Sequence, residues 1–423
     1  MITPVQNTPT TKTSGSSLFR TADGKNLFVT FALVSSLFLL WGFCSGLLDN
    51  LNKHFQNSLH LSKFQSGFVQ NAFYMGYCLV AFPAGMIARR FGYKGGIIVG
   101  LSLAAAGAFW FIPAVGINAY WAFLMGLFIL ACGLGCLETN ANPYTTVLGP
   151  PESGATRINI AQTCNGIGWI SGMFIGAHVI LSATKEVNTS NAKLSIPYMG
   201  IGIVVAVLLV IFIFAKIPDL RAAEEFKAEA EGKATKSIFK RSHFTLGVVA
   251  QFFYVAAQTG IFSFFINYSV ANINNLSDQA AGNLQTLAFA LFAGGRLVGS
   301  AVVGLTKPHK ALALYAVVNT VMMVLAMAGG GWVGVVGVMA SFFFMSIMFP
   351  TIFALSIRGL GDHTKLGSSL LVVSIVGGAT APLMGLIADK GGMRIGFVIP
   401  LVCFVVIAIY GALWQKLESK DAA

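Results

Sequence analysis

The sequence predicts an all-α membrane protein with twelve transmembrane helices in two six-helix halves. First, the chain is 56 % hydrophobic and only 10 % charged, whereas roughly a quarter of the residues of a soluble domain are charged. Second, apolar segments long enough to cross a bilayer, which takes about 20 residues, recur along the whole chain. Third, one long polar connection separates the first six segments from the last six.

Each predicted span is a mainly apolar run of bilayer-crossing length. In chain order the spans are Leu27–Phe55, Gln65–Ala88, Gly95–Val115, Ala119–Leu148, Ile158–Leu181, Ile196–Ala215, Phe244–Ala271, Leu284–Leu305, Ala311–Gly329, Trp332–Ile357, Gly367–Ala388 and Ile395–Trp414. They divide the chain into an N-terminal tail, a first half, a linker, a second half and a C-terminal tail, with the ranges 1–26, 27–215, 216–242, 243–414 and 415–423.

The basic residues predict the orientation. With the N-terminal tail inside, 20 of the 27 Lys and Arg residues fall on the inner side, six fall on the outer side, and Arg296 lies within a span. Because Lys and Arg are retained on the cytoplasmic side, we expect both chain ends in the cytoplasm. The net charge of +12 is scattered over short loops, so we do not expect nucleic-acid binding.

Two carboxylates interrupt the apolar segments. Of the 15 Asp and Glu residues, only Asp49 and Glu138 lie well inside predicted spans, while the others fall in tails, loops or segment ends. Embedding a carboxylate in a bilayer costs a few kcal/mol, and such residues usually serve ion or proton traffic. We therefore predict that these two acids are proton-coupling residues. The alternative is that each acid caps a helix or pairs with a buried donor.

Small and polar residues share faces of several spans. In the first span, Gly42, Ser45, Gly46, Asp49 and Asn52 recur at helical spacing and are expected to line a cavity. Amides and aromatic residues in later spans suit a polyhydroxylated ligand, because an amide both donates and accepts hydrogen bonds, as sugar hydroxyls do. The alternative for each amide is a hydrogen bond between helices. The predicted substrate-binding residues are Ser45, Asn142, Gln162, Asn165, Trp169, Tyr254 and Gln258.

Two halves of six spans joined by a cytoplasmic linker imply the major facilitator architecture, with the substrate bound between the halves. The loop after the second span, Gly85-Met86-Ile87-Ala88-Arg89-Arg90-Phe91-Gly92-Tyr93-Lys94, is similar to the signature Gly-x-Leu-Ala-Asp-Arg-x-Gly-Arg-Arg of that superfamily. Arg89 replaces the signature aspartate. We assign Arg89 and Arg90 of this loop, and Arg296 in the eighth span, to gating.

Longer stretches resemble the fucose permease branch of this superfamily, the fucose–galactose–glucose:proton symporter family. The most specific are Cys136-Leu137-Glu138-Thr139-Asn140-Ala141-Asn142-Pro143-Tyr144 and Asn159-Ile160-Ala161-Gln162-Thr163-Cys164-Asn165. The resemblance implies uptake of a monosaccharide together with protons, across the inner membrane of a bacterium. It implies that Asp49 and Glu138 are the embedded acids of the family, and that Gln162 and Asn165 contact the sugar.

The sequence departs from fucose permease just before its first embedded acid. It reads Ser45-Gly46-Leu47-Leu48-Asp49, where fucose permease has Asn-Asn-Leu-Asn-Asp. The loss of amides leaves open whether the sugar is L-fucose-like or another hexose. The alternative function on the same scaffold is a proton-driven exporter of sugars or drugs.

Catalysis and metal binding have no support in the sequence. It contains no HExxH, no nucleophile elbow and no phosphate-binding glycine loop, and its cysteines have no nearby His, so we predict neither an enzyme nor a metal site. We expect no cofactor, since a proton gradient drives transport, and sodium remains an alternative ion. The expected partners are a monosaccharide, protons and the lipid bilayer, and we expect a monomer.

Overall fold

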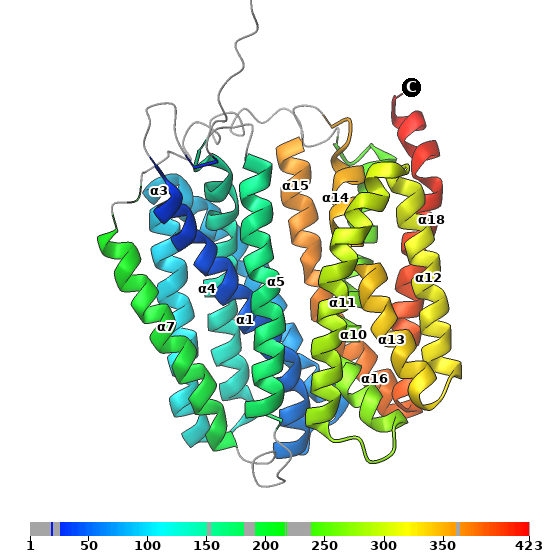
Figure 1. The fold of residues 1–423 in the computed structure, drawn as a ribbon, viewed down its shortest axis with the longest axis horizontal. Coiled ribbons are helices and arrows are strands. Elements are labelled where there is room, and N and C mark those ends of the chain that lie inside the picture. Colours follow the sequence, from blue (N-terminus) through cyan, green and yellow to red (C-terminus); the bar gives the residue numbers. More distant parts are fainter. Residues whose placement is uncertain are drawn as a thin grey trace, which may run out of the picture.

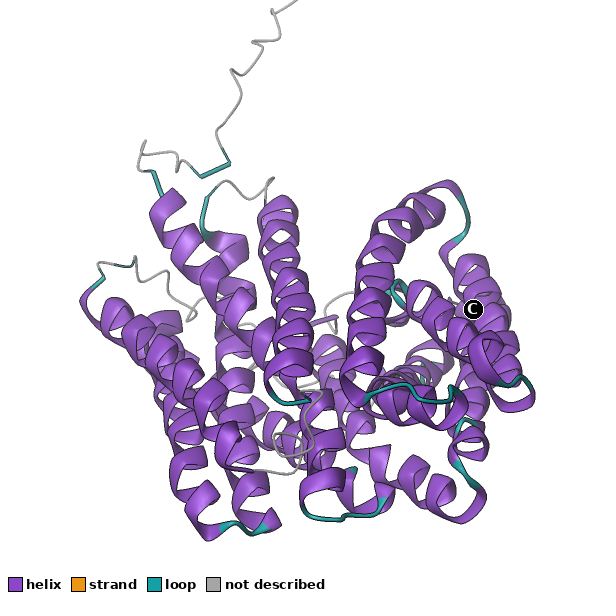
Figure 2. Cartoon of the chain, turned by 60° about the horizontal axis from the view of Figure 1, so that its bottom comes forward, coloured by secondary structure: helices purple, strands orange, loops and turns teal. Residues whose placement is uncertain are grey.

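The computed structural model describes residues 18–19, 26–149, 154–181, 191–215, 217, 238–360 and 364–422. Nearly all of these residues are helical, as predicted, and short loops connect the helices (Figure 2). Figure 1 shows two groups of helices side by side, which we call the first group and the second group. The first group is α1 (Phe28–Ser58), α2 (Lys63–Ser66), α3 (Phe68–Ile117), α4 (Tyr120–Val147), α5 (Gly154–Val179), η2 (Asn191–Leu194) and α7 (Ser195–Phe214).

The second group follows residue 238. It contains α10 (Ser242–Asn272), α11 (Asp278–Leu305), α12 (Pro308–Ala328), α13 (Gly331–Met345), α14 (Met348–Ile357), α15 (Thr364–Val373), η4 (Ser374–Thr380), α16 (Ala381–Gly391), α17 (Met393–Gly396) and α18 (Val398–Ala422).

Ten helical segments of the described chain are long and apolar enough to cross a membrane. The two remaining predicted spans are α5 and α11, helices of 26 and 28 residues. Both helices lie within the bundle (Figure 1). The second and third predicted spans follow one another within α3 as two helical segments, which meet at Gly92, where the backbone is not helical and φ is 71°. This backbone conformation favours glycine, because a Cβ atom would be strained there.

Two predicted spans of the second group are interrupted. The tenth span consists of α13 and α14, and the eleventh consists of α15, η4 and α16. Pro350 and Pro382 lie in the first turns of α14 and α16. Because proline has no N–H, each leaves the carbonyl four residues earlier without its helical partner. Both segments, Gly331–Ile357 and Leu370–Gly391, are still long and apolar enough to cross a membrane, as predicted.

The two ends of the bundle can be told apart by the helix termini that lie there. The C-terminus and the start of α1 lie at one end, which we call the proximal end (Figure 1). Helices α1, α5 and α10 finish at the opposite end, which we call the distal end. A helix rises 1.5 Å per residue. Asp49, nine residues before the end of α1, therefore lies about 14 Å from its distal terminus, whereas Glu138 lies at a similar distance from the proximal end of α4.

Glycines bring α1 and α5 into direct backbone contact. A Cβ atom on Gly42 would overlap the carbonyl oxygen of Asn165, and one on Gly46 would overlap that of Trp169. Close approach at small residues is the usual way in which membrane helices pack. The expectation that these two glycines line a cavity is therefore wrong, because they form a helix–helix interface.

Candidate functional site

Asp49 lies at the junction of the two groups. Its side chain is buried, and each carboxylate oxygen accepts one hydrogen bond from an amide. Gln70 Nε2 on α3 donates to Oδ1 at 2.8 Å, and Gln285 Nε2 on α11 donates to Oδ2 at 3.1 Å. The first donor belongs to the same group as Asp49, and the second belongs to the other group. The carboxylate therefore joins the two groups in this structure.

Further polar contacts join α1 to the second group beyond Asp49. Asn52 Nδ2 donates to the carbonyl oxygen of Ser263 at 3.1 Å. The side-chain amides of Gln56 and Asn267 bond to one another, one turn nearer the distal end. At that end Lys53 pairs with Asp278, with Nζ and Oδ1 3.6 Å apart. These contacts close the distal end between α1 and the helices α10 and α11.

A second seam closes the same end between α2, α3 and the η4–α16 segment. Asp389 accepts the Lys63 and Phe64 backbone N–H groups at 3.0 and 2.8 Å, and it pairs with Lys63 Nζ at 3.3 Å. Asn71 Nδ2 donates to the carbonyl of Ala379 at 3.0 Å. At Gly378 the Tyr74 ring fills the space that a side chain would need.

Aromatic side chains cross between the groups near the midplane. Trp169 on α5 packs edge-on against Phe262 of α10 and Phe289 of α11, with ring centroids 5.9 and 5.2 Å apart. Phe262 also stacks on Phe342 of α13 at 4.6 Å. In this conformation the predicted sugar-stacking indole is part of a cluster that seals the middle of the bundle on its distal side.

Glu138 has a different setting. Its side chain is half-buried, and none of the described residues forms a hydrogen bond or an ion pair with it. Tyr74 and Tyr77 on α3 are within electrostatic range of its carboxylate. The carboxylate is therefore available to a proton or to a ligand hydroxyl.

The amides of α4 and α5 fall into two kinds. Gln162 Nε2 donates to Asn142 Oδ1 at 3.3 Å, and both side chains remain half-buried. Asn142 lies one turn beyond Glu138 on α4, so these three residues form a polar patch of the first group. Asn165 is more deeply buried and donates through Nδ2 to the carbonyl of Phe38 at 3.1 Å. Its amide therefore fastens α5 to α1.

The other predicted substrate-binding residues are dispersed. Tyr254 is buried, and its hydroxyl donates to the carbonyl of Met345 at 3.1 Å, within the second group. Gln258 is half-buried one turn further along α10. Ser45 is buried on α1, one turn before Asp49.

The predicted gating arginines lie away from the distal contacts. The Arg89 side chain is outside the described part of the structure, and Arg90 is exposed with its guanidinium 5.3 Å from the Phe91 ring centroid. Arg296 lies in the proximal third of α11, with its guanidinium 5.1 Å from the Phe292 ring centroid. In the same loop as Arg89, Lys94 Nζ binds the carbonyls of Ile213 and Ala215 at the end of α7.

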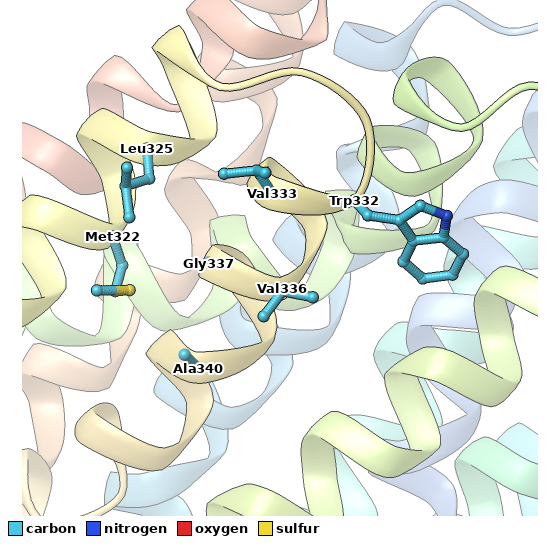
Figure 3. Close-up of a pocket in the computed structure, with 7 residues that line it drawn as sticks. All are labelled: Met322, Leu325, Trp332, Val333, Val336, Gly337 and Ala340. Atoms are coloured by element: carbon cyan, nitrogen blue, oxygen red, sulfur yellow. The ribbon is translucent and has the colours of Figure 1, made fainter.

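An apolar groove lies elsewhere, between α12 and α13. Figure 3 shows Trp332, Val333 and Val336 of α13 on one side, and Met322 and Leu325 of α12 on the other. It contains none of the predicted site residues, and its lining offers almost no polar surface to a sugar. Among the described residues, no three His, Cys, Asp or Glu side chains gather as a metal site.

Sequence reasoning missed the two amides that hold Asp49. Gln70 and Gln285 each stand near the beginning of a span, where one polar residue carries no particular signal. Their common partner becomes evident only when α3 and α11 are placed on either side of α1.

Comparison with known proteins identifies the family. A family model described as Major Facilitator Superfamily matches residues 27–371. The chain belongs to the major facilitator superfamily. Within it the chain falls in the predicted fucose permease branch, because it is 38 % identical to the L-fucose-proton symporter of Escherichia coli K12 over 94 % of this chain and 95 % of that protein. The relatives are transporters, as predicted, and not enzymes.

A second relative and a solved structure extend this comparison. The chain is 37 % identical to a glucose/galactose transporter of Brucella abortus, over 94 % of this chain and 96 % of that protein. A fucose symporter solved in the outward conformation is 38 % identical, with a TM-score of 0.65 over 91 % of this chain and 98 % of that chain. The fold and the superfamily are thus as predicted from the sequence.

Proposed function

We propose that this chain is a proton-coupled symporter that carries a monosaccharide into the cell by alternating access. The observation that supports this best is the pair of embedded carboxylates. Asp49 binds both helix groups, and Glu138, near the Asn142–Gln162 amides, has no partner among the described residues. A symporter needs protonation to be linked both to rearrangement of the halves and to binding of the sugar. The two acids meet these needs separately.

The relatives narrow the substrate class. One is named an L-fucose-proton symporter and another a glucose/galactose transporter, at nearly equal identity. We therefore propose a hexose or a deoxyhexose. We propose protons rather than sodium as the coupling ion, because the described residues around Asp49 offer it amide N–H donors rather than a cage of oxygen ligands.

The orientation belongs to the same proposal. We place both chain ends in the cytoplasm of a bacterial cell, with two halves at 27–215 and 243–414 around the 216–242 linker, working as a monomer in the inner membrane. The distal end is then the outer end, and the contacts at Asp49, Asn52 and Gln56 close the protein to the outside. This is an inward-facing arrangement. A different placement of the halves would account for the TM-score of 0.65 with a 38 % identical relative in the outward conformation.

Reconstituted proteoliposomes test this function. Counterflow with labelled L-fucose, D-galactose and D-glucose identifies the sugar, and accumulation is then measured with an imposed pH or sodium gradient. We expect accumulation when the interior is alkaline, and its loss on addition of a protonophore. Accumulation driven by sodium alone would contradict proton coupling. Accumulation when the interior is acidic would instead identify the exporter.

A further inference from the structure

Gln285 has an amide orientation that its surroundings fix. Its Nε2 donates to the carbonyl oxygen of Phe262 at 2.7 Å and to Asp49 Oδ2 at 3.1 Å, so both amide hydrogens are used. If the amide were reversed, Oε1 would face two acceptors, since an amide oxygen cannot donate. The Phe262 carbonyl therefore holds an N–H group toward the carboxylate of Asp49.

Gln285 is also shielded from water, so that loss of its bond to Asp49 is not compensated by solvent. Its side chain is fully buried, and its Oε1 atom forms no hydrogen bond within the described structure. A buried donor that loses its acceptor is left without water to replace it. Separation of α11 from α1 would thus break the bond to Asp49, while the bond to Phe262 would stay within the second group.

No charged side chain among the described residues replaces Gln285 as a partner of the Asp49 carboxylate. On α3, Tyr74 is the titratable side chain within electrostatic range of Asp49. On α1, Lys53 is paired with Asp278 at the start of α11, and His54 faces Asn191 with a separation of 3.0 Å. On α10, the carbonyl of Ser263 binds Asn52. The hydrogen bonds to the carboxylate described here therefore come from neutral amides.

We infer that Gln285 is a positioning residue that makes closure of the distal end depend on the charge of Asp49. A hydrogen bond to an ionised carboxylate is roughly twice as strong as one between neutral groups. Gln70 lies in the same group as Asp49, so it can stay bound in either conformation. Gln285 lies in the other group, so its bond contributes only to the closed state. The inference rests on the proposed function for its meaning in transport.

The test measures closure and needs no transport. Spin labels are placed on cysteines introduced at Ala192 and Asn274, two exposed positions at the distal end in opposite groups, after the six native cysteines are replaced. Pulsed electron-spin distances in lipid nanodiscs then give the closed fraction from acid to alkaline pH. The variant is Gln285→Met, which keeps the length of the side chain and removes both amide hydrogens.

The matched control is Gln56→Met, which removes another amide contact between the groups without touching Asp49. For Gln285→Met we expect the closed-to-open ratio to fall about tenfold at alkaline pH and about threefold or less at acid pH. For Gln56→Met we expect a fall that is the same at every pH. In an Asp49→Asn background, the effect of Gln285→Met should lose its pH dependence.

Two results would overturn the inference: a fall for Gln285→Met that does not vary with pH, or no fall at all. If Gln285→Met does not fold, Gln285→Asn serves instead, because it retains the donor but shortens its reach, and the same pH-dependent fall is expected. A protein that transports no sugar but shows the pH-dependent fall would contradict the proposed function and leave this inference intact. Sugar symport without such a fall would support the proposed function and contradict this inference.

Discussion

The two embedded acids lie toward opposite ends of the helix bundle and in opposite chemical settings. Asp49 is buried, lies toward the distal end and is held by one amide from each helix group. Glu138 lies toward the proximal end, is half-buried and has no hydrogen-bonding partner among the described residues. Burial of an unpaired carboxylate is costly. The difference therefore indicates that the Asp49 carboxylate is satisfied by protein amides in this conformation. The Glu138 carboxylate is instead available to a proton or to a hydroxyl of the sugar.

This contrast assigns different parts of the cycle to the two acids. Asp49 changes partners when the helix groups move apart, so its proton is linked to the conformation. Glu138 lies beside the Asn142–Gln162 pair, so its proton is linked to occupancy by a sugar. Substitutions of single residues can therefore affect one of these two linkages without the other.

The largest effect is expected for Asp49→Asn. Asparagine keeps the shape and removes the charge, so the carrier can still exchange one sugar for another but cannot release a proton. A gradient of one pH unit stores about 1.4 kcal/mol, which can support roughly tenfold accumulation. We expect Asp49→Asn to fall to simple equilibration while counterflow persists. Accumulation of labelled sugar in proteoliposomes measures this, and a normal accumulation ratio would remove Asp49 from the coupling mechanism.

A smaller effect is expected for the amides of α5. Gln162→Ala should weaken sugar binding by about 1 to 3 kcal/mol, the cost of a buried partner left unpaired, with little change in thermal stability. Asn165→Ala should lower both affinity and melting temperature, because Asn165 also fastens α5 to α1. Quenching of tryptophan fluorescence, with Trp169 one turn from Asn165 as a reporter, gives the affinities. Unchanged affinity in both variants would make these amides purely structural.

The smallest effect is expected for Tyr254→Phe. The Tyr254 hydroxyl is already bound to the carbonyl of Met345, so its loss should cost about 1 kcal/mol of stability and change the sugar affinity less than about twofold. Isothermal titration and thermal unfolding of the purified protein separate the two quantities. A tenfold loss of affinity would instead identify Tyr254 as a sugar ligand.

The fold could be predicted from the sequence because its two signals, long apolar segments and the distribution of Lys and Arg over the loops, each extend over many residues. It was also sufficient to single out Asp49 and Glu138, since an acid inside an apolar segment is rare. It did not reveal the breaks at Pro350 and Pro382 as separate helices, because a proline in a membrane helix is often accommodated by its neighbours.

The partners of Asp49 were beyond sequence reasoning for a different reason. Gln70 and Gln285 lie in two apolar segments that are more than two hundred residues apart in the sequence. Their meeting depends on how the two helix groups are placed, which no local pattern encodes. Gly42 and Gly46 illustrate the same limit, since small residues on a helix face suit either a cavity or a close helix contact.

The most direct test of the division of roles is the pH dependence of sugar affinity in three proteins. Dissociation constants are measured from acid to alkaline pH for the wild type, Glu138→Gln and Asp49→Asn. We predict a pH-dependent affinity in the wild type and in Asp49→Asn, and a flat profile in Glu138→Gln. A flat profile in Asp49→Asn together with a retained profile in Glu138→Gln would contradict the account, because the two acids would then have exchanged roles.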